Sequence, residues 1–153
     1  MFRNVLAAAV LTALLISTST TYAQKAEFGT PAEARAMLDQ VVAGMKADRA
    51  ATLARISKGE GGFKDRDLYP YCVSPEGKYV AHPDPARIGL VLKDVKDKSG
   101  KAYGEEIAKV AEEGKVAEVN YVFPRPGGNG SPVPKVGLVA KIGSYICVVG
   151  YYK

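Results

Sequence analysis

Residues that commonly carry metal and catalytic chemistry are scarce in this sequence. Its 153 residues include one histidine, two cysteines and no tryptophan. Any histidine-containing metal site or serine–histidine–aspartate triad would have to include His82. Neither a G-x-S-x-G nucleophile turn nor a redox-active C-x-x-C pair is present. We therefore expect no enzyme activity, no metal site and no cofactor.

A membrane-spanning run is also missing. The longest apolar stretch, residues 5–16, has 12 positions, whereas a spanning helix needs about 20. It follows the basic residue Arg3 and precedes small residues that end at Ala23, which is the layout of a secretory signal peptide. We expect residues 1–23 to be a cleaved export signal, residues 24–29 a linker and residues 30–153 one domain. The mature protein is then expected in the periplasm or outside the cell.

Charge of one sign is nowhere concentrated. The formal net charge is +5, and lysines alternate with aspartates through residues 93–101. Binding to nucleic acid would need a clustered basic patch with stacking aromatic residues, so we expect a solvated face and no nucleic-acid partner. With 47% hydrophobic and 24% charged residues, the composition is that of a globular domain.

The first expected element is a long helix. Thr30 and Glu33 form a capping box, with Pro31 at the first helical position. Apolar residues then recur at helical spacing up to Ile56. The pattern predicts one helix that ends before Gly59, about 25 residues and about 40 Å long.

From residue 68 the apolar period changes to two, which indicates strands. We expect strands at residues 68–74, 79–82, 116–123, 135–142 and 145–152, and a short helix at residues 103–113. Together these elements predict an α+β domain in which a five-stranded antiparallel sheet has helices on one side or end.

Several stretches resemble, in their order and spacing, the single Cache domain, a PAS-like extracellular sensor module of bacterial chemoreceptors and sensor kinases. They are LYPY at 68–71, EGKYVAHP at 76–83, IG at 88–89, DVKDKSGK at 94–101, VNYVFPRP at 119–126, PK at 134–135 and VGYY at 149–152. The resemblance implies a PAS-like fold with a long N-terminal helix packed on the sheet. It also implies a pocket that binds small extracellular molecules, often short carboxylates.

The sequence departs from the family pattern in two ways. Phe123 and Tyr145 stand where members commonly have tryptophan, and the chain ends at Lys153 without the signalling domain that most relatives carry. We therefore expect an exported ligand-binding domain that signals the presence of its bound ligand to a membrane receptor or sensor kinase. The alternative is an interaction module whose pocket is filled by its own side chains and whose N-terminal helix forms a homodimer.

Six residues are candidates for the ligand site. They are Tyr69, Tyr71, His82, Arg87, Tyr121 and Lys135. Tyr69 and Tyr71 lie two positions apart, so they share one strand face, either as pocket wall or as core. His82 is expected at a strand end, where it either donates a hydrogen bond to an anion or bonds to the backbone.

Two of these candidates are cations. Arg87 falls in the loop that would roof the pocket, where a guanidinium suits a planar carboxylate. Lys135 follows Pro134 and faces a segment that includes Tyr121. An inward ammonium must meet an anion, because burying an unpaired charge is costly. Surface solvation is the alternative for both cations, and a small organic acid is the expected ligand.

Cys72 and Cys147 form an even pair in a chain expected to be exported. They fall on the first and last expected strands, which are neighbours in a PAS-like strand order. A disulfide and two buried free thiols are the two alternatives.

Overall fold

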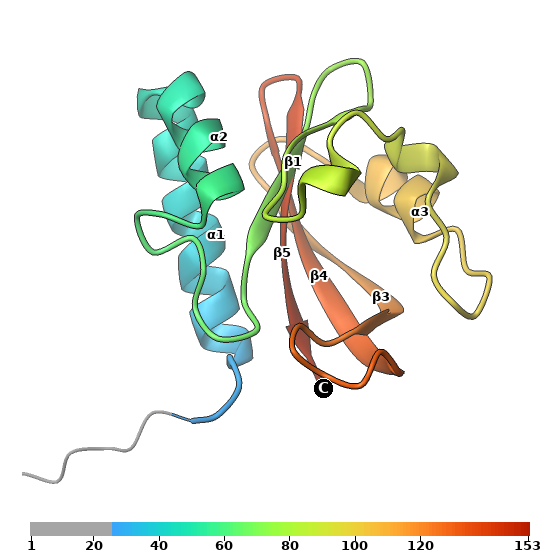
Figure 1. Cartoon of the computed structure of the whole chain (residues 1–153). Coiled ribbons are helices and arrows are strands. Elements are labelled where there is room, and N and C mark those ends of the chain that lie inside the picture. The colour runs from blue at the N-terminus through green and yellow to red at the C-terminus, as the bar shows by residue number, and fades with distance from the viewer. Residues whose placement is uncertain (1–25) are drawn as a thin grey trace, which may run out of the picture.

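The computed structural model describes residues 26–153 (Figure 1). The predicted export signal lies outside these residues, as does the start of the predicted linker. The helices are α1 (Pro31–Ala47), α2 (Arg49–Lys58) and α3 (Tyr103–Val110), with short 3₁₀ turns η1 (Pro85–Arg87) and η2 (Leu92–Asp94). The strands are β1 (Pro70–Val73), β2 (Tyr79–Ala81), β3 (Val116–Pro124), β4 (Pro132–Ile142) and β5 (Tyr145–Tyr152).

The expectation of one long helix is wrong, because the helix breaks at Asp48 into a hairpin of α1 and α2 (Figure 1). Asp48 has extended backbone angles, φ −149° and ψ 94°, and its carboxylate accepts a hydrogen bond from the Ala51 N–H. Aspartate is among the best N-caps, so it starts a second helix here. A Cβ on Gly44 would lie 2.7 Å from the Thr52 hydroxyl, so glycine allows the two helices to pack closely. The capping box at Thr30 is confirmed.

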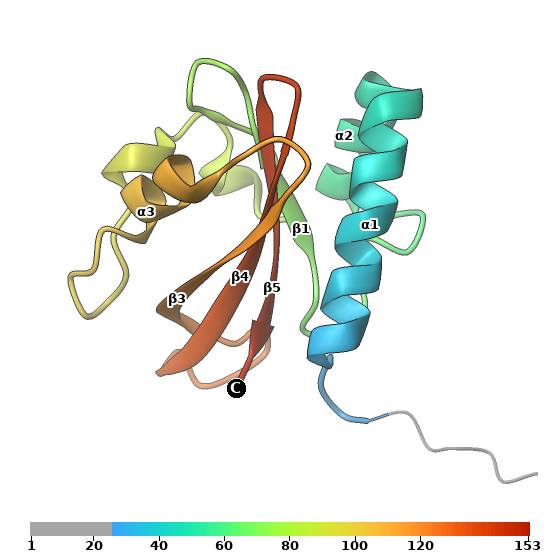
Figure 2. The same ribbon diagram turned by 180° about the vertical axis from the view of Figure 1, so that it is seen from behind.

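The predicted five-stranded antiparallel sheet is confirmed, with strand order β2-β1-β5-β4-β3. This order brings the first and last expected strands side by side. The expectation of helices on one side or end of the sheet is wrong, because the α1–α2 hairpin covers one face and η1, η2 and α3 lie on the other (Figures 1 and 2). Each face has its own apolar cluster, so the sheet is buried on both sides. Within residues 26–153 no helix combines the length and apolar character needed to cross a membrane.

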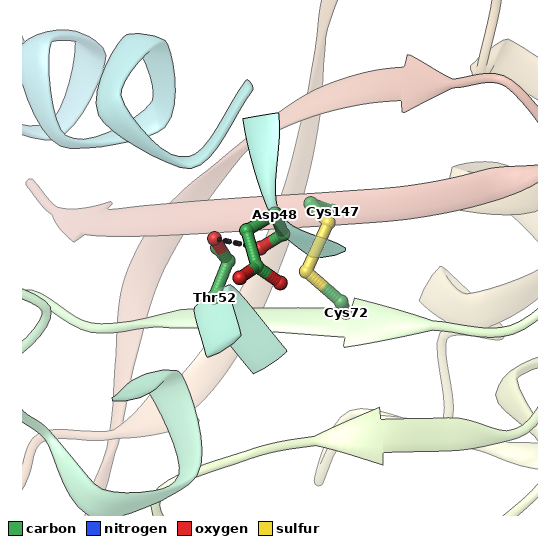
Figure 3. The surroundings of a disulfide bond; sticks show 4 residues. All are labelled: Asp48, Thr52, Cys72 and Cys147. Atoms are coloured by element: carbon green, nitrogen blue, oxygen red, sulfur yellow. Dashed lines mark hydrogen bonds between the residues drawn. A yellow bond between two sulfur atoms is a disulfide. The ribbon is translucent and has the colours of Figure 1, made fainter. Parts of the chain in front are cut away.

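A disulfide joins the neighbouring strands β1 and β5 in the middle of the sheet. Cys72 on β1 and Cys147 on β5 are direct partners in the antiparallel register, and they are bonded to each other. Both residues are fully buried in the cluster beneath the helical hairpin. Figure 3 shows the bridge beside Asp48 and Thr52. The Thr52 hydroxyl donates a hydrogen bond to the backbone carbonyl of Asp48. Of the two alternatives that the sequence leaves open, the structure contains the bridge.

Candidate ligand site

Two neighbouring cavities lie on the α3 side of the sheet. The outer cavity has a volume of about 270 Å³ and the inner one about 10 Å³. They share four wall residues, which are Tyr69, His82, Arg87 and Phe123. The remaining outer walls are Lys64, Arg66, Pro83, Asp84 and Pro126. The remaining inner walls are Tyr71, Tyr79, Tyr103 and Tyr121, so we call the small cavity the tyrosine chamber.

Lys135 carries a buried ammonium beside these cavities. The residue is 3% exposed, and its Nζ donates to the hydroxyls of Tyr69 at 3.2 Å and Tyr152 at 3.3 Å. Nζ also lies 4.4 Å from the centre of the Tyr69 ring and 5.4 Å from that of Phe123. Burial lowers the pKa of Lys135 to about 7, with Arg87 acting in the same direction and Asp67 against it. In the part of the chain that the structure describes, no carboxylate forms an ion pair with this ammonium.

Asp67 is the acidic group that acts on Lys135, and its carboxylate is held elsewhere. It is 3% exposed, and Oδ1 accepts a hydrogen bond of 2.7 Å from the Gly29 N–H. Oδ2 lies 3.6 Å from Nε of Arg125, whose guanidinium also lies over the Tyr152 ring. The Asp67 carboxylate therefore binds Gly29 in the chain segment before α1 and lies near Arg125. The ammonium of Lys135 is hydrogen-bonded only to the hydroxyls of Tyr69 and Tyr152 among the described residues.

His82 is buried at the end of β2 and is uncharged at neutral pH. Its Nδ1 accepts a hydrogen bond of 2.8 Å from the Asp84 N–H, so the neutral ring carries its proton on Nε2. Burial lowers the pKa of His82 to about 4, and the charge of Arg87 adds to the effect. Both roles expected for this histidine are compatible, because it bonds to backbone and also forms part of both cavity walls.

Arg87 extends from η1 over the ring of Phe123, with Cζ 4.7 Å from the ring centre. The side chain is half-buried. Among residues 26–153, no hydrogen bond or ion pair engages its guanidinium. The nearby Asp84 carboxylate instead caps η1 by accepting from the Ala86 N–H. The planar donor group of Arg87 is therefore available to a ligand in either cavity.

The tyrosine chamber is walled by packed rings. Tyr103 and Tyr121 are stacked with ring centres 4.4 Å apart, and Tyr71 and Tyr79 lie 5.2 Å apart. Burial raises the pKa of Tyr71 and of Tyr121 well above the ordinary value, so their hydroxyls stay protonated and can donate hydrogen bonds. Arg87, the neutral imidazole of His82 and several phenols line this small space, and the Lys135 ammonium is hydrogen-bonded to the wall residue Tyr69, which suits an anion with an apolar part.

Comparison with known proteins identifies the family. The family model Single Cache domain 2 matches residues 9–152. The chain belongs to this family. The match begins inside the segment in which the sequence predicts an export signal. Among curated proteins, none matches the chain.

Solved structures share the fold of this Cache domain. The periplasmic sensor domain of a chemotaxis protein is 23% identical with a TM-score of 0.60, over 78% of this chain and 87% of that one. A Cache chemosensory domain described for carboxylic acid recognition is 22% identical with a TM-score of 0.59, over 78% and 85%. A methyl-accepting chemotaxis protein from Vibrio parahaemolyticus is 18% identical with a TM-score of 0.63, over 77% and 84%.

The Cache domain brings five of the six sequence candidates together around the tyrosine chamber. Lys135 lines neither this chamber nor the outer cavity. Its Nζ lies over the rings of Tyr69 and Phe123, and its side chain lines a separate cavity of about 290 Å³ together with Tyr121. Of the two positions where relatives commonly have tryptophan, Phe123 forms part of both cavity walls. Tyr145 instead faces α2, where the guanidinium of Arg49 lies 4.7 Å from its ring centre. No group of three residues able to hold a metal ion occurs within residues 26–153.

Four residues with a role in this site were missed from the sequence. They are Asp67, Tyr79, Tyr103 and Tyr152. Tyr79 is buried at the start of β2 in the apolar cluster on the α3 face, whereas Ala81 belongs to the cluster on the other face, so the short strand gives no clear alternation signal. Tyr103 starts α3, and Asp67 lies in the loop before β1, so only the folded arrangement brings them to the site.

Proposed function

We propose that this chain is a periplasmic sensor domain that binds a short organic carboxylate. The observation that carries the proposal is the convergence of Lys135 and Arg87 on Phe123. Both cations lie over the same aromatic ring, at 5.4 Å and 4.7 Å from its centre, and neither is paired with a carboxylate in the described chain. A buried ammonium is costly without an anion, and a carboxylate ligand would supply one.

The ligand must be small. A charge-assisted hydrogen bond contributes about 1.5–3 kcal/mol. For an acid of five or six heavy atoms, the best ligand efficiency of about −1.5 kcal/mol per atom allows about −8 kcal/mol, which corresponds to a micromolar Kd. The outer cavity, at about 270 Å³, can hold such a molecule. A site of this affinity suits a sensor of nutrient concentrations.

Isothermal titration against acetate, propionate and pyruvate tests the proposal. Lys135→Met keeps the apolar stem and removes the charge, and we expect it to weaken binding about thirty- to a hundredfold. Lys141→Met is the matched control, because Lys141 lies on the same strand with its side chain exposed. It should bind like the wild type. Equal affinities for wild type and Lys135→Met would show that the Lys135 ammonium does not bind the acid.

One observation favours a second function, an interaction module with a filled pocket. The tyrosine chamber measures only about 10 Å³, because the aromatic side chains that line it nearly close it. In this case the α1–α2 hairpin would form a dimer or docking surface. The same titrations separate the two functions, since absence of heat with every acid would favour the interaction module.

Membership of the Cache family supports the proposed location and partner. One of the similar structures is a periplasmic sensor domain of a chemotaxis protein. We propose export of this chain to the periplasm with removal of residues 1–23, and transfer of ligand occupancy to a membrane receptor or sensor kinase. Mass spectrometry of protein recovered from the periplasm should give a start near Gln24. Protein in the membrane fraction that still begins at Met1 would contradict cleavage.

A further inference from the structure

Residues 26–29, which we call the N-terminal strap, are bound to the loop before β1. This loop passes beside the start of α1 (Figures 1 and 2). The guanidinium of Arg66 donates hydrogen bonds of 2.9 Å and 2.8 Å to the carbonyls of Ala26 and Phe28. Arg66 is also the one residue other than glycine, within residues 26–153, with a left-handed backbone, at φ 57°. Such a conformation persists only where the surroundings hold it, so the loop and the strap depend on each other.

The next residue of the loop, Asp67, is a buried carboxylate that the strap holds by one oxygen only. Its Oδ1 accepts from the Gly29 N–H at 2.7 Å. Its Oδ2 has no hydrogen-bond partner in the described chain and lies 3.6 Å from Nε of Arg125. Buried polar atoms nearly always have a partner, so this oxygen calls for an explanation. The Gly29 N–H is the contact that fixes the direction of the carboxylate.

Asp67 lies close to the buried ammonium of the ligand site. The guanidinium carbon of Arg125 is 4.9 Å from the centre of the Tyr152 ring, and Nζ of Lys135 is 4.5 Å from the same centre. The two cations therefore share one ring, and the charge of Asp67 acts on Lys135. Lys135 lacks a carboxylate partner, and Asp67 has an oxygen to offer. In the described structure the two groups are nevertheless not paired.

We infer that the strap controls the ligand site through Asp67. While the strap is attached, Gly29 holds the carboxylate away from Lys135, and the ammonium is available to an acid. When the strap detaches, the carboxylate turns to the ammonium and excludes the acid. This inference rests on the carboxylate-binding function proposed above and adds its regulation.

The physical argument is a competition between two carboxylates for one buried cation. Burying an unpaired ammonium is costly, and Asp67 already lies in the same cluster at a high effective concentration. Detachment also removes the Phe28 ring, which lies 3.7 Å from the guanidinium carbon of Arg125. Arg125 would then be more exposed to water, where an ion pair with Asp67 is weak. Lys135 thus becomes the better partner for Asp67 once the strap has left.

Gly29→Pro tests the inference, because it detaches the strap at one position. Proline removes the N–H that binds Asp67, and a Cβ at residue 29 would lie 2.2 Å from Cγ of Leu68. Isothermal titration at pH 6 should use whichever of acetate, propionate and pyruvate the wild type binds most tightly. We expect a Kd about tenfold higher, which corresponds to about one molecule in ten remaining competent to bind. Glu27→Ala is the matched control, since this side chain is exposed in the same segment, and it should bind like the wild type.

The double variant Gly29→Pro/Asp67→Asn separates competition from a general loss of structure. An amide has no charge to neutralise the ammonium, so the double variant should regain the wild-type Kd although its strap is still detached. A wild-type Kd in Gly29→Pro, or a loss that Asp67→Asn does not restore, would overturn this inference and leave carboxylate binding intact. If none of the three acids binds to the wild type, the proposed function fails and this inference fails with it.

Hydrogen exchange measures the strap directly. Coupling between two sites is reciprocal, so a saturating acid should favour the attached strap by the same factor by which the strap favours the acid. Exchange of the Gly29 N–H in the wild type should therefore slow about tenfold when the acid is bound. In Asp67→Asn the acid should leave this rate unchanged. An exchange rate that the acid does not alter in the wild type would overturn the coupling.

Discussion

Gly150 leaves room for Lys135. A Cβ built on Gly150 would lie 2.3 Å from Cε of Lys135, which is closer than real atoms approach, and 3.3 Å from its Nζ. The lysine side chain therefore lies across the neighbouring strand over a position that has no side chain of its own. The burial of this ammonium depends on a glycine fifteen positions along the chain, on the adjacent strand β5.

Gly150→Ala is expected to displace the ammonium from the hydroxyls of Tyr69 and Tyr152. Lysine is flexible, so the cost in stability should be modest, a few degrees in melting temperature. Affinity for the bound acid should fall about tenfold or more, because the cation leaves its place. Titration of Gly150→Ala, Lys135→Met and the double variant measures the coupling. Equal affinities of the double variant and Lys135→Met would support displacement, and fully additive losses would contradict it.

The disulfide should stabilise the fold without contributing to ligand binding. Cys72 and Cys147 are 75 positions apart in sequence, and the chain-entropy model gives about 4.5 kcal/mol for closing a loop of that length. Replacing both by alanine should lower the free energy of unfolding by an amount of this order, as measured in urea. Affinity for acids should persist, since the sulfurs face the helical hairpin on the other side of the sheet. A large loss of affinity at unchanged stability would show that the bridge shapes the cavities.

Much of the fold could be predicted from the sequence, because the capping box, the strand alternation and the turn residues are local signals. The break at Asp48 could not, since the apolar residues on both sides keep helical spacing. Asp48 caps the second helix, and the close approach of Gly44 to Thr52, which favours the hairpin, exists only once the helices are folded together. For the site, the spacing of two positions between Tyr69 and Tyr71 was enough to predict that they share one strand face. Asp67 was not, because its effect on Lys135 depends on distance in space and not in sequence.

The neutral histidine makes stability depend on pH. The pKa of His82 is lowered to about 4 by burial and by Arg87, against about 6.5 in the unfolded chain. Below pH 6.5 the unfolded state therefore binds a proton that the folded state does not, and stability falls as the pH falls toward 4. Relative to His82→Asn, the wild type should lose about 2 kcal/mol of unfolding free energy between pH 7.5 and pH 5. Urea unfolding at both values measures the difference, and parallel pH curves for the two proteins would contradict the assignment.

Binding of an acid should take up a proton at Lys135. The ammonium is faced by the hydroxyls of Tyr69 and Tyr152, by Arg87, which opposes its charge, and by Asp67, which supports it. With its pKa lowered to about 7 by burial, most of the side chain is neutral at pH 8 in the free protein. A carboxylate placed beside it favours the charged form and raises this pKa, so the complex recovers the proton.

Titration at pH 8 in two buffers of different ionisation enthalpy measures this uptake. We expect it to approach about one proton per acid bound at pH 8, and to be near zero at pH 6, where the free ammonium is already charged. Affinity should correspondingly fall as the pH rises above 7. Lys135→Met should show no such uptake, and Lys141→Met should behave like the wild type. If the observed heat is independent of the buffer at pH 8 while the acid still binds, the ammonium of Lys135 is not the group that meets the carboxylate, and Arg87 alone would then supply the charge.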